Sequence, residues 1–279
     1  MQTSSDIIKS GKYTFNVKRE IMEYNGTIFA RTYQIGGDYK DCINISYKYS
    51  SGKPISASIP HLLSEPECTI GSDLKRGSGT EQMIKESIKY AYNDIPSLSI
   101  FTFDDNSHID CIEKLRESTP PRKLKKPLSL SLFSIAYYGK TWYELRFNAQ
   151  MTDKNKYNTY RDALQFLTNP QSKVSFMKFL EISRPQADLI QYLEPIYIAS
   201  STYREFFENI PRDKRCDILY GWLSTFMMHY LGTSFTDKGW EIDARAMSKI
   251  SNIKRGGYTR KRKHAFNYRI IDHIDMHRI

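Results

Sequence analysis

The sequence predicts a mixed α/β (α+β) fold, in which a mostly antiparallel sheet flanked by helices precedes an all-helical C-terminal extension. In the N-terminal part, short runs rich in Ile, Tyr, Phe and Thr alternate apolar with polar residues, which is the period of a half-buried strand. From about residue 157 onward, apolar residues recur instead at helical spacing between short breaks. The composition, 40% hydrophobic and 13% aromatic, is that of a folded chain.

The N-terminal strands are expected at 12–17, 27–35, 42–50 and 53–63. The segments between them, such as "EYNG", "GGDYKD" and "SSGKP", contain the Gly, Asn, Asp and Pro residues that favour turns. Because these connections are short, we expect neighbouring strands to pair as an antiparallel meander.

A helix is expected at 80–93, where apolar residues recur at i, i+3 and i+4, with Thr80 as its cap. The segment "SLSIFTFDD" at 97–105 then reads as a strand. A strand, a glycine turn, a helix and a second strand in this order predict a crossover that joins two parallel neighbours.

The second half begins with a basic, proline-containing linker at 118–127 and a helix at 128–147. The longest expected helix, 212–232, is apolar on nearly every side and ends at Gly232, so it reads as a central core helix. The predicted organisation is an α/β domain at 1–150, a helical extension at 151–252 and a basic tail at 253–279.

Positive charge gathers in that tail. The chain carries a formal charge of +10, and residues 253–279 contain eight Lys or Arg against two Asp, a balance of +6. Such a tail can bind nucleic-acid phosphates, act as an import signal or meet an acidic partner, although a charge run can also be only a solvated tail.

No signal peptide is expected, because the first residues lack an apolar h-region of the usual length. No membrane span is expected either, because no uninterrupted apolar run reaches the roughly 18 residues that a spanning helix needs. Cys42, Cys68, Cys111 and Cys216 form no C-x-x-C pair, so the expectation is four reduced, buried thiols and no zinc site. We therefore expect a soluble intracellular protein.

The stretch "KRGSGTE" at 75–81 leads from an expected strand into the expected helix. Glycines there allow close approach to the backbone, and a helix start presents unpaired N–H groups and positive charge, as phosphate binding requires. The pattern is neither a Walker A loop nor a complete G-x-G-x-x-G. A tight connection without a ligand is the competing interpretation.

Antiparallel strands, the R-G-S-G-T turn, a helix, a strand and a later "IAYYGKTWYELRF" segment together resemble the GNAT superfamily of acyl-CoA-dependent N-acyltransferases, over about residues 10–150. The resemblance implies that Arg76, Gly77, Ser78, Gly79 and Thr80 bind the cofactor pyrophosphate, mainly through backbone amides. It also implies that Tyr143 is the general acid toward the thiolate of acetyl-CoA. The sequence departs from the pattern at Glu81, where the family prefers Gly or Ala, and lacks the Gly-Phe that follows the family's Tyr.

Such a transfer needs a base or a water relay that deprotonates the amine. Glu67 is the leading candidate, and the alternatives are Glu65, Asp104, Asp105 and His108. The stretch "FDDNSHIDC" at 103–111 also has elements of a metal site or of a Cys111–His108 nucleophile pair, but neither set is complete. We expect no bound metal.

Two functions follow as hypotheses. The first is an acyl-CoA-dependent N-acetyltransferase that acts on a primary amine of a protein or small molecule. The second is a non-catalytic GNAT-like scaffold that serves as a viral structural or nucleic-acid-associated protein. The Lys-, Ile-, Tyr- and Asn-rich composition and the basic tail resemble proteins of large nucleocytoplasmic DNA viruses, which implies a host cytoplasmic, nuclear or virion location.

Overall fold

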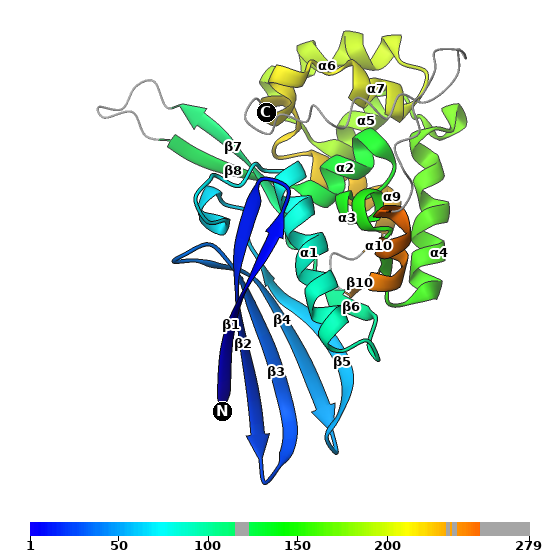
Figure 1. The fold of residues 1–279 in the computed structure, drawn as a ribbon. Helices are drawn as coiled ribbons and strands as arrows, with labels where there is room; N and C mark the ends of the chain where they lie inside the picture. The colour runs from blue at the N-terminus through cyan, green and yellow to red at the C-terminus, as the bar shows by residue number, and fades with distance from the viewer. Residues whose placement is uncertain (115–122, 233–234, 236–238, 252–279) are drawn as a thin grey trace, which may run out of the picture. The chain divides into compact units, whose positions relative to one another are not determined.

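The computed structural model describes residues 1–114, 123–232, 235 and 239–251. The chain is a mixed α/β protein, whose helices and strands are labelled in Figure 1. It divides into two compact units. In its described part, the first unit contains 1–104, 147–149 and 240–251, and the second contains 105–114, 123–146, 150–232, 235 and 239. The second unit is therefore inserted between segments of the first.

The first unit is built on a large sheet. Its elements are β1 (Gln2–Ser10), β2 (Tyr13–Tyr24), β3 (Thr27–Gly36), β4 (Asp41–Ser50), β5 (Lys53–Leu62), η1 (Pro66–Cys68), α1 (Ser78–Asp94), β6 (Ile100–Phe103), β10 (Trp240–Asp243) and α10 (Ala244–Ser251). Its strands lie in the order β1-β2-β3-β4-β5-β6-β10. The blue strands of Figure 1 form the meander that the alternation predicts, since each consecutive pair from β1 to β5 is antiparallel.

Alternating side chains of this sheet form one half of the core. Tyr13, Phe15 and Val17 on β2 are buried at every second position, as are Ile43 and Ile45 on β4. Helix α1 supplies the other half through the buried side chains of its apolar face, Met83, Ile84, Ile88 and Ala91. The helix lies on the sheet because both surfaces have an apolar stripe to bury.

The pair β5 and β6 is parallel, and α1 forms the crossover between them, as predicted. Their pairing covers Ala57–Ile59 against Phe101–Phe103, and β5 continues to Leu62 beyond its last partner on β6. This parallel pair stands among antiparallel pairs, because β6 also pairs antiparallel with β10.

Three sequence expectations for this unit need correction. Strand β1 was not expected, because its sequence is mostly polar and does not alternate; in the structure, only Ile8 of its nine residues is buried. Helix α1 begins at Ser78 with Gly77 at the N-cap, and Thr80 lies in its first turn, so Thr80 is not the cap. The extension after residue 150 is not wholly helical either, because β10 returns to pair with β6.

The second unit is largely helical. Its elements are β7 (His108–Lys114), β8 (Lys123–Ser129), α2 (Leu130–Tyr138), α3 (Trp142–Phe147, whose last residue belongs to the first unit), β9 (Gln150–Met151), α4 (Lys154–Ala163), η2 (Leu164–Leu167), η3 (Pro170–Ser172), α5 (Phe176–Ser183), α6 (Ala187–Ala199), α7 (Tyr203–Asn209), η4 (Arg212–Lys214), α8 (Arg215–Leu219) and α9 (Leu223–Leu231). Strands β7 and β8 form a separate antiparallel pair.

Aromatic rings fill the centre of this unit. Phe179 on α5 packs against Phe206, Trp222 and Phe226 with ring centroids 5.4–5.5 Å apart, and each of these side chains is essentially inaccessible to solvent. Edge-to-face packing of this kind stabilises a core beyond the area that it buries.

Two expected long helices are broken at glycines. The expected helix 128–147 begins two residues later and is divided by Gly139, which has φ 68° at the end of α2. The expected helix 212–232 is divided by Gly221, with φ 87°, into the short helices before and after it. Gly232 ends α9 as predicted. Strand β8 also occupies part of the expected linker 118–127, of which 118–122 lies outside the described residues.

The cysteines form two disulfides, Cys42–Cys68 in the first unit and Cys111–Cys216 in the second. The expectation of reduced thiols is therefore wrong. Spacing along the chain could not reveal the pairs, because the partners are 26 and 105 residues apart and only the fold brings them together.

Among the described residues, the longest and most apolar helices still fall short of what a bilayer span requires. The tail at 253–279 lies outside the described residues, so its predicted contact with nucleic acid or an acidic partner stays a prediction.

Candidate functional site

The predicted phosphate turn lies at the start of α1. Gly77 has φ 77° and ψ −92°, a conformation that side chains disfavour, so glycine is required there by the backbone. Lys75, Arg76 and Ser78 are exposed, whereas Gly79 and Thr80 are buried. The turn thus presents two cations and one hydroxyl to solvent at the positive end of a 17-residue helix.

Part of the turn's hydrogen-bonding capacity is already used. The Gly79 amide donates to the Lys75 carbonyl at 2.9 Å, and the Glu81 amide donates to the Gly77 carbonyl at 2.9 Å. Within the described part of the chain, the amides of Gly77 and Ser78 have no hydrogen-bond partner. These two amides are the ones that remain available to an anion.

Gly79 has a packing role of its own. A Cβ at this position would lie 2.9 Å from the Tyr13 hydroxyl and 3.2 Å from Leu74 Cδ1. The absence of a side chain therefore lets α1 approach β2 closely. Thr80 also faces inward, where its hydroxyl is hydrogen-bonded to that of Ser64. These two residues connect the helix to its own unit.

The predicted base Glu67 lies on η1, exposed, on a segment adjacent to this turn. The Leu74 amide donates to the Pro66 carbonyl at 2.9 Å, and the disulfide attaches η1 to β4. A Cβ on Gly37 would lie 2.0 Å from the Glu67 carbonyl oxygen, so η1 packs directly on the β3–β4 connection. The fold thus brings Glu67 and the Arg76–Thr80 turn onto neighbouring segments of one unit.

Glu81, the departure from the GNAT pattern, forms an i,i+4 ion pair with Lys85 on α1. This pairing gives the carboxylate a partner on its own helix.

Tyr143, the predicted acid, belongs to the second unit. Its side chain is 6% exposed and packs edge-on against Trp142 at 5.0 Å. Burial, and then the charge of Asp105, raise the pKa of the Tyr143 hydroxyl far above its ordinary value. These surroundings are those of a core tyrosine, which keeps its proton.

The "FDDNSHIDC" stretch forms the start of β7 and the turn before it. Asp105 is buried and accepts hydrogen bonds from the amide and hydroxyl of Ser107, the former at 3.0 Å. Because Cys111 is in a disulfide, it is not a nucleophile in this state. In the described part of the chain, the His, Cys, Asp and Glu side chains form no group that could hold a metal ion.

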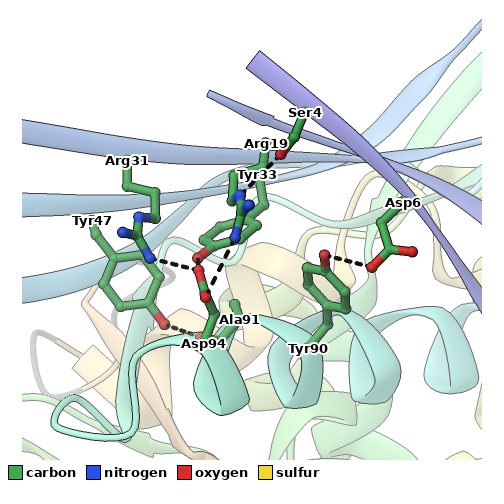
Figure 2. A network of polar contacts seen from close by, with 9 residues as sticks. All are labelled: Ser4, Asp6, Arg19, Arg31, Tyr33, Tyr47, Tyr90, Ala91 and Asp94. Carbon is green, nitrogen blue, oxygen red and sulfur yellow. Dashed lines mark hydrogen bonds and ion pairs between the residues drawn. The ribbon is translucent and has the colours of Figure 1, made fainter. Parts of the chain in front are cut away.

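A polar network that sequence reasoning missed holds the last residue of α1, Asp94 (Figure 2). Arg31 on β3 contacts its carboxylate at 2.6 Å, Arg19 on β2 lies at 3.5 Å, and the Tyr33 hydroxyl donates to it. Burial by itself raises the pKa of Asp94, but the hydrogen bond from Tyr33 and the charges of Arg31 and Arg19 more than offset this, so the pKa lies below its ordinary value.

Nearby bonds along the same helix extend the network. The Tyr47 hydroxyl donates to the Ala91 carbonyl at 3.0 Å, and Tyr90 donates to Asp6 on β1 at 2.9 Å. A carboxylate at a helix C-terminus interacts unfavourably with the macrodipole, and the two arginines offset that interaction. We assign the network a structural role, which is to fix α1 to the sheet.

The second unit has a buried acid, Glu144, that sequence reasoning also missed. Its carboxylate accepts from the Thr141 amide at 2.7 Å and from the hydroxyls of Tyr157 and Tyr160 at 3.1 and 2.8 Å, and Arg161 lies at 3.5 Å. The Glu144 amide donates in turn to the Thr141 hydroxyl. "TWYE" is therefore a capping box, whose T-x-x-E spacing was visible in the sequence.

Comparisons of the chain with protein-family models, with curated proteins and with solved structures gave no match. Hypotheses about function therefore depend on the local chemistry alone.

Proposed function

We propose that the chain is an acyl-CoA-dependent N-acyltransferase that binds the cofactor phosphates at the start of α1. The observation that carries the proposal is the parallel crossover from β5 through α1 to β6, set in an otherwise antiparallel run of strands. Ligands of α/β folds bind beyond the carboxyl ends of parallel strands, and the Arg76 turn follows the carboxyl end of β5.

The chemistry of the turn supports this assignment. Arg76 and Lys75 add two exposed cations, and the Gly77 and Ser78 amides add two donors at the positive end of the helix. Gly79 and Thr80 would hold the turn in place by packing against their own unit, while Glu67, exposed on the neighbouring η1 segment, would deprotonate the amine acceptor. Acetyl-CoA is the proposed cofactor, and the acceptor would be a primary amine on a protein or small molecule.

Calorimetric titration of the full chain with acetyl-CoA tests the proposal. Micromolar binding is expected, with a loss of about tenfold in Arg76→Gln, because a charge-assisted hydrogen bond to phosphate is removed. Lys9→Gln, an exposed position on β1, is the control with the same change of charge. Absence of binding at millimolar acetyl-CoA, or an equal loss in both variants, would exclude the turn as the cofactor site.

A second candidate is a non-catalytic scaffold that serves as a structural or nucleic-acid-associated protein, as in a large DNA virus. Two observations favour it: Tyr143 is buried, and Gly79 is explained by its packing against Tyr13. Acyl transfer to a panel of amines separates the candidates. The scaffold would be supported if acetyl-CoA binds but no free thiol is released with any amine, and if Tyr143→Phe changes neither acetyl-CoA binding nor thiol release.

A further inference from the structure

A cluster of arginines lies around the C-terminal end of α2 in the second unit. Arg215 on α8 stacks over the Tyr137 ring at 3.9 Å and donates through Nε to the Ile210 carbonyl at 3.4 Å. Arg204 on α7 lies against Gly139, where a Cβ would be 2.8 Å from its Nη2 atom. Separate elements thus bring these guanidinium groups to one place.

Tyr138 lies among these charges. Burial raises the pKa of its hydroxyl, and the charges of Arg215, Arg212, Arg146 and Arg204 oppose that rise. Tyr138 is partly exposed, and the exposed Arg212 lies three residues before Arg215, on the η4 turn that leads directly into α8. Glu208, one turn along α7 from Arg204, influences both the Arg204 guanidinium and the Tyr137 hydroxyl, but it forms no ion pair with Arg204.

The cluster contains polar atoms that the protein does not satisfy. The Arg204 Nε and the Tyr137 hydroxyl are buried and have no hydrogen-bond partner among the described residues. Burial lowers the pKa of Arg204, but a guanidinium does not lose its proton in a protein, so the charge persists. An unpaired, partly buried charge destabilises the fold, and a bound counter-charge would relieve this cost.

The C-terminal dipole of α2 does not provide enough negative charge. It is equivalent to roughly half an elementary charge. Arg161, which also pairs with Glu144, already donates to the Gly139 carbonyl at 3.4 Å. Among the described residues, Arg204, Arg212 and Arg215 form no ion pair. Arg212 is exposed and Arg215 stacks on the Tyr137 ring, so none of the three positive charges is paired with a carboxylate there.

We propose that Arg204, Arg212 and Arg215 form a binding site for the phosphate group of a small-molecule ligand. Planar guanidinium groups bind phosphate oxygens through paired N–H donors, and three of them match the charge of a terminal phosphate better than that of one diester. This site lies in the second unit and is independent of the turn at the start of α1.

Calorimetric titration of the full chain with inorganic pyrophosphate at low salt tests the site. Arg212→Gln changes an exposed residue and is expected to weaken binding about tenfold, whereas Lys156→Gln, an exposed residue on α4, leaves it unchanged. Absence of binding at millimolar pyrophosphate, or an equal effect of both variants, would overturn the proposal. A short oligonucleotide without terminal phosphates is titrated in parallel. If it alone binds, with the same loss in Arg212→Gln, the phosphates recognised are those of a nucleic-acid backbone and the small-molecule assignment is wrong.

Arg204→Gln separates ligand binding from a structural role. If Arg204 binds the anion, Arg204→Gln weakens pyrophosphate binding, while the melting temperature of the ligand-free protein stays constant or rises. A lower melting temperature with unchanged pyrophosphate affinity would show that Arg204 supports the fold, and would remove it from the site.

Discussion

The contact between Asp94 and the sheet gives the most direct test of how α1 is fixed. In Asp94→Asn the side chain keeps its size and loses its charge, so the two arginines and Tyr33 stay in place with a weaker partner. The Arg31 side chain is 15% exposed and that of Asp94 is 29% exposed, so water screens the pair only in part.

The expected loss follows from the contacts. The Arg31 contact at 2.6 Å is a charge-assisted hydrogen bond, which contributes about 1.5 kcal/mol at the lower end of its usual range because the pair is partly solvated. Weakening the Tyr33 bond costs about 0.5 kcal/mol, and Arg19, at 3.5 Å and one-third exposed, contributes little. We therefore expect Asp94→Asn to lower the free energy of unfolding by about 2 kcal/mol at neutral pH.

Urea unfolding, with hydrogen exchange in α1 as the local measurement, tests this value. The exposed Asp73→Asn is the matched control and should change stability by less than about 0.5 kcal/mol. Because the folded-state pKa of Asp94 is lowered, its contribution is present above the ordinary Asp pKa of about 3.9 and is lost as pH falls through the folded value. Wild type and Asp94→Asn should thus converge in strong acid. Equal stability of the two at neutral pH would refute the reasoning.

Three further predictions concern other parts of the chain. Replacing both Cys111 and Cys216 with serine should lower the free energy of unfolding by about 4–5 kcal/mol, because the unfolded chain regains the entropy of a long loop. Peptide mapping of the wild-type protein without reductant should recover the two cysteines as a linked pair. Burial and the Glu144 charge raise the pKa of Tyr157 to about 12, so Glu144→Gln should lower it in an ultraviolet titration; an unchanged value would contradict the contact. Burial raises the pKa of the Tyr33 hydroxyl, so its contribution to the free energy of unfolding should be constant below about pH 10 and fall above it. In alkaline unfolding, the wild type should therefore lose more stability above about pH 10 than Tyr33→Phe does.

The parts of the fold that sequence could predict are those with local signals. Alternation located β2 to β5, and helical spacing located α1, so the parallel crossover followed from the order of elements alone. Strand β1 is a polar edge strand and offers no such pattern. Strand β8 contains Pro127, which a two-stranded pair tolerates because one edge of the strand needs no N–H donor.

Long-range features left no trace in the local pattern. The pairing of Trp240 with Phe103 and the disulfide partners depend on how distant segments meet. For the candidate site, the sequence located the glycine turn before α1, and the structure shows that Gly77 has a positive φ there. The sequence could not separate the conformational need for glycine at Gly77 from the packing need for glycine at Gly79, because the sequence shows only a glycine at each position.

The return of β10 to the first unit affects the order in which the protein can be completed during synthesis. Strands β1 to β5 are hairpin neighbours and can pair as soon as they leave the ribosome, because little chain separates them. On its other side, β6 pairs with β10 (Trp240–Asp243), which the ribosome synthesises only after the described part of the second unit. Until then β6 exposes an unpaired strand edge, so nascent chains that stall before residue 240 should be the ones that aggregate or recruit chaperones.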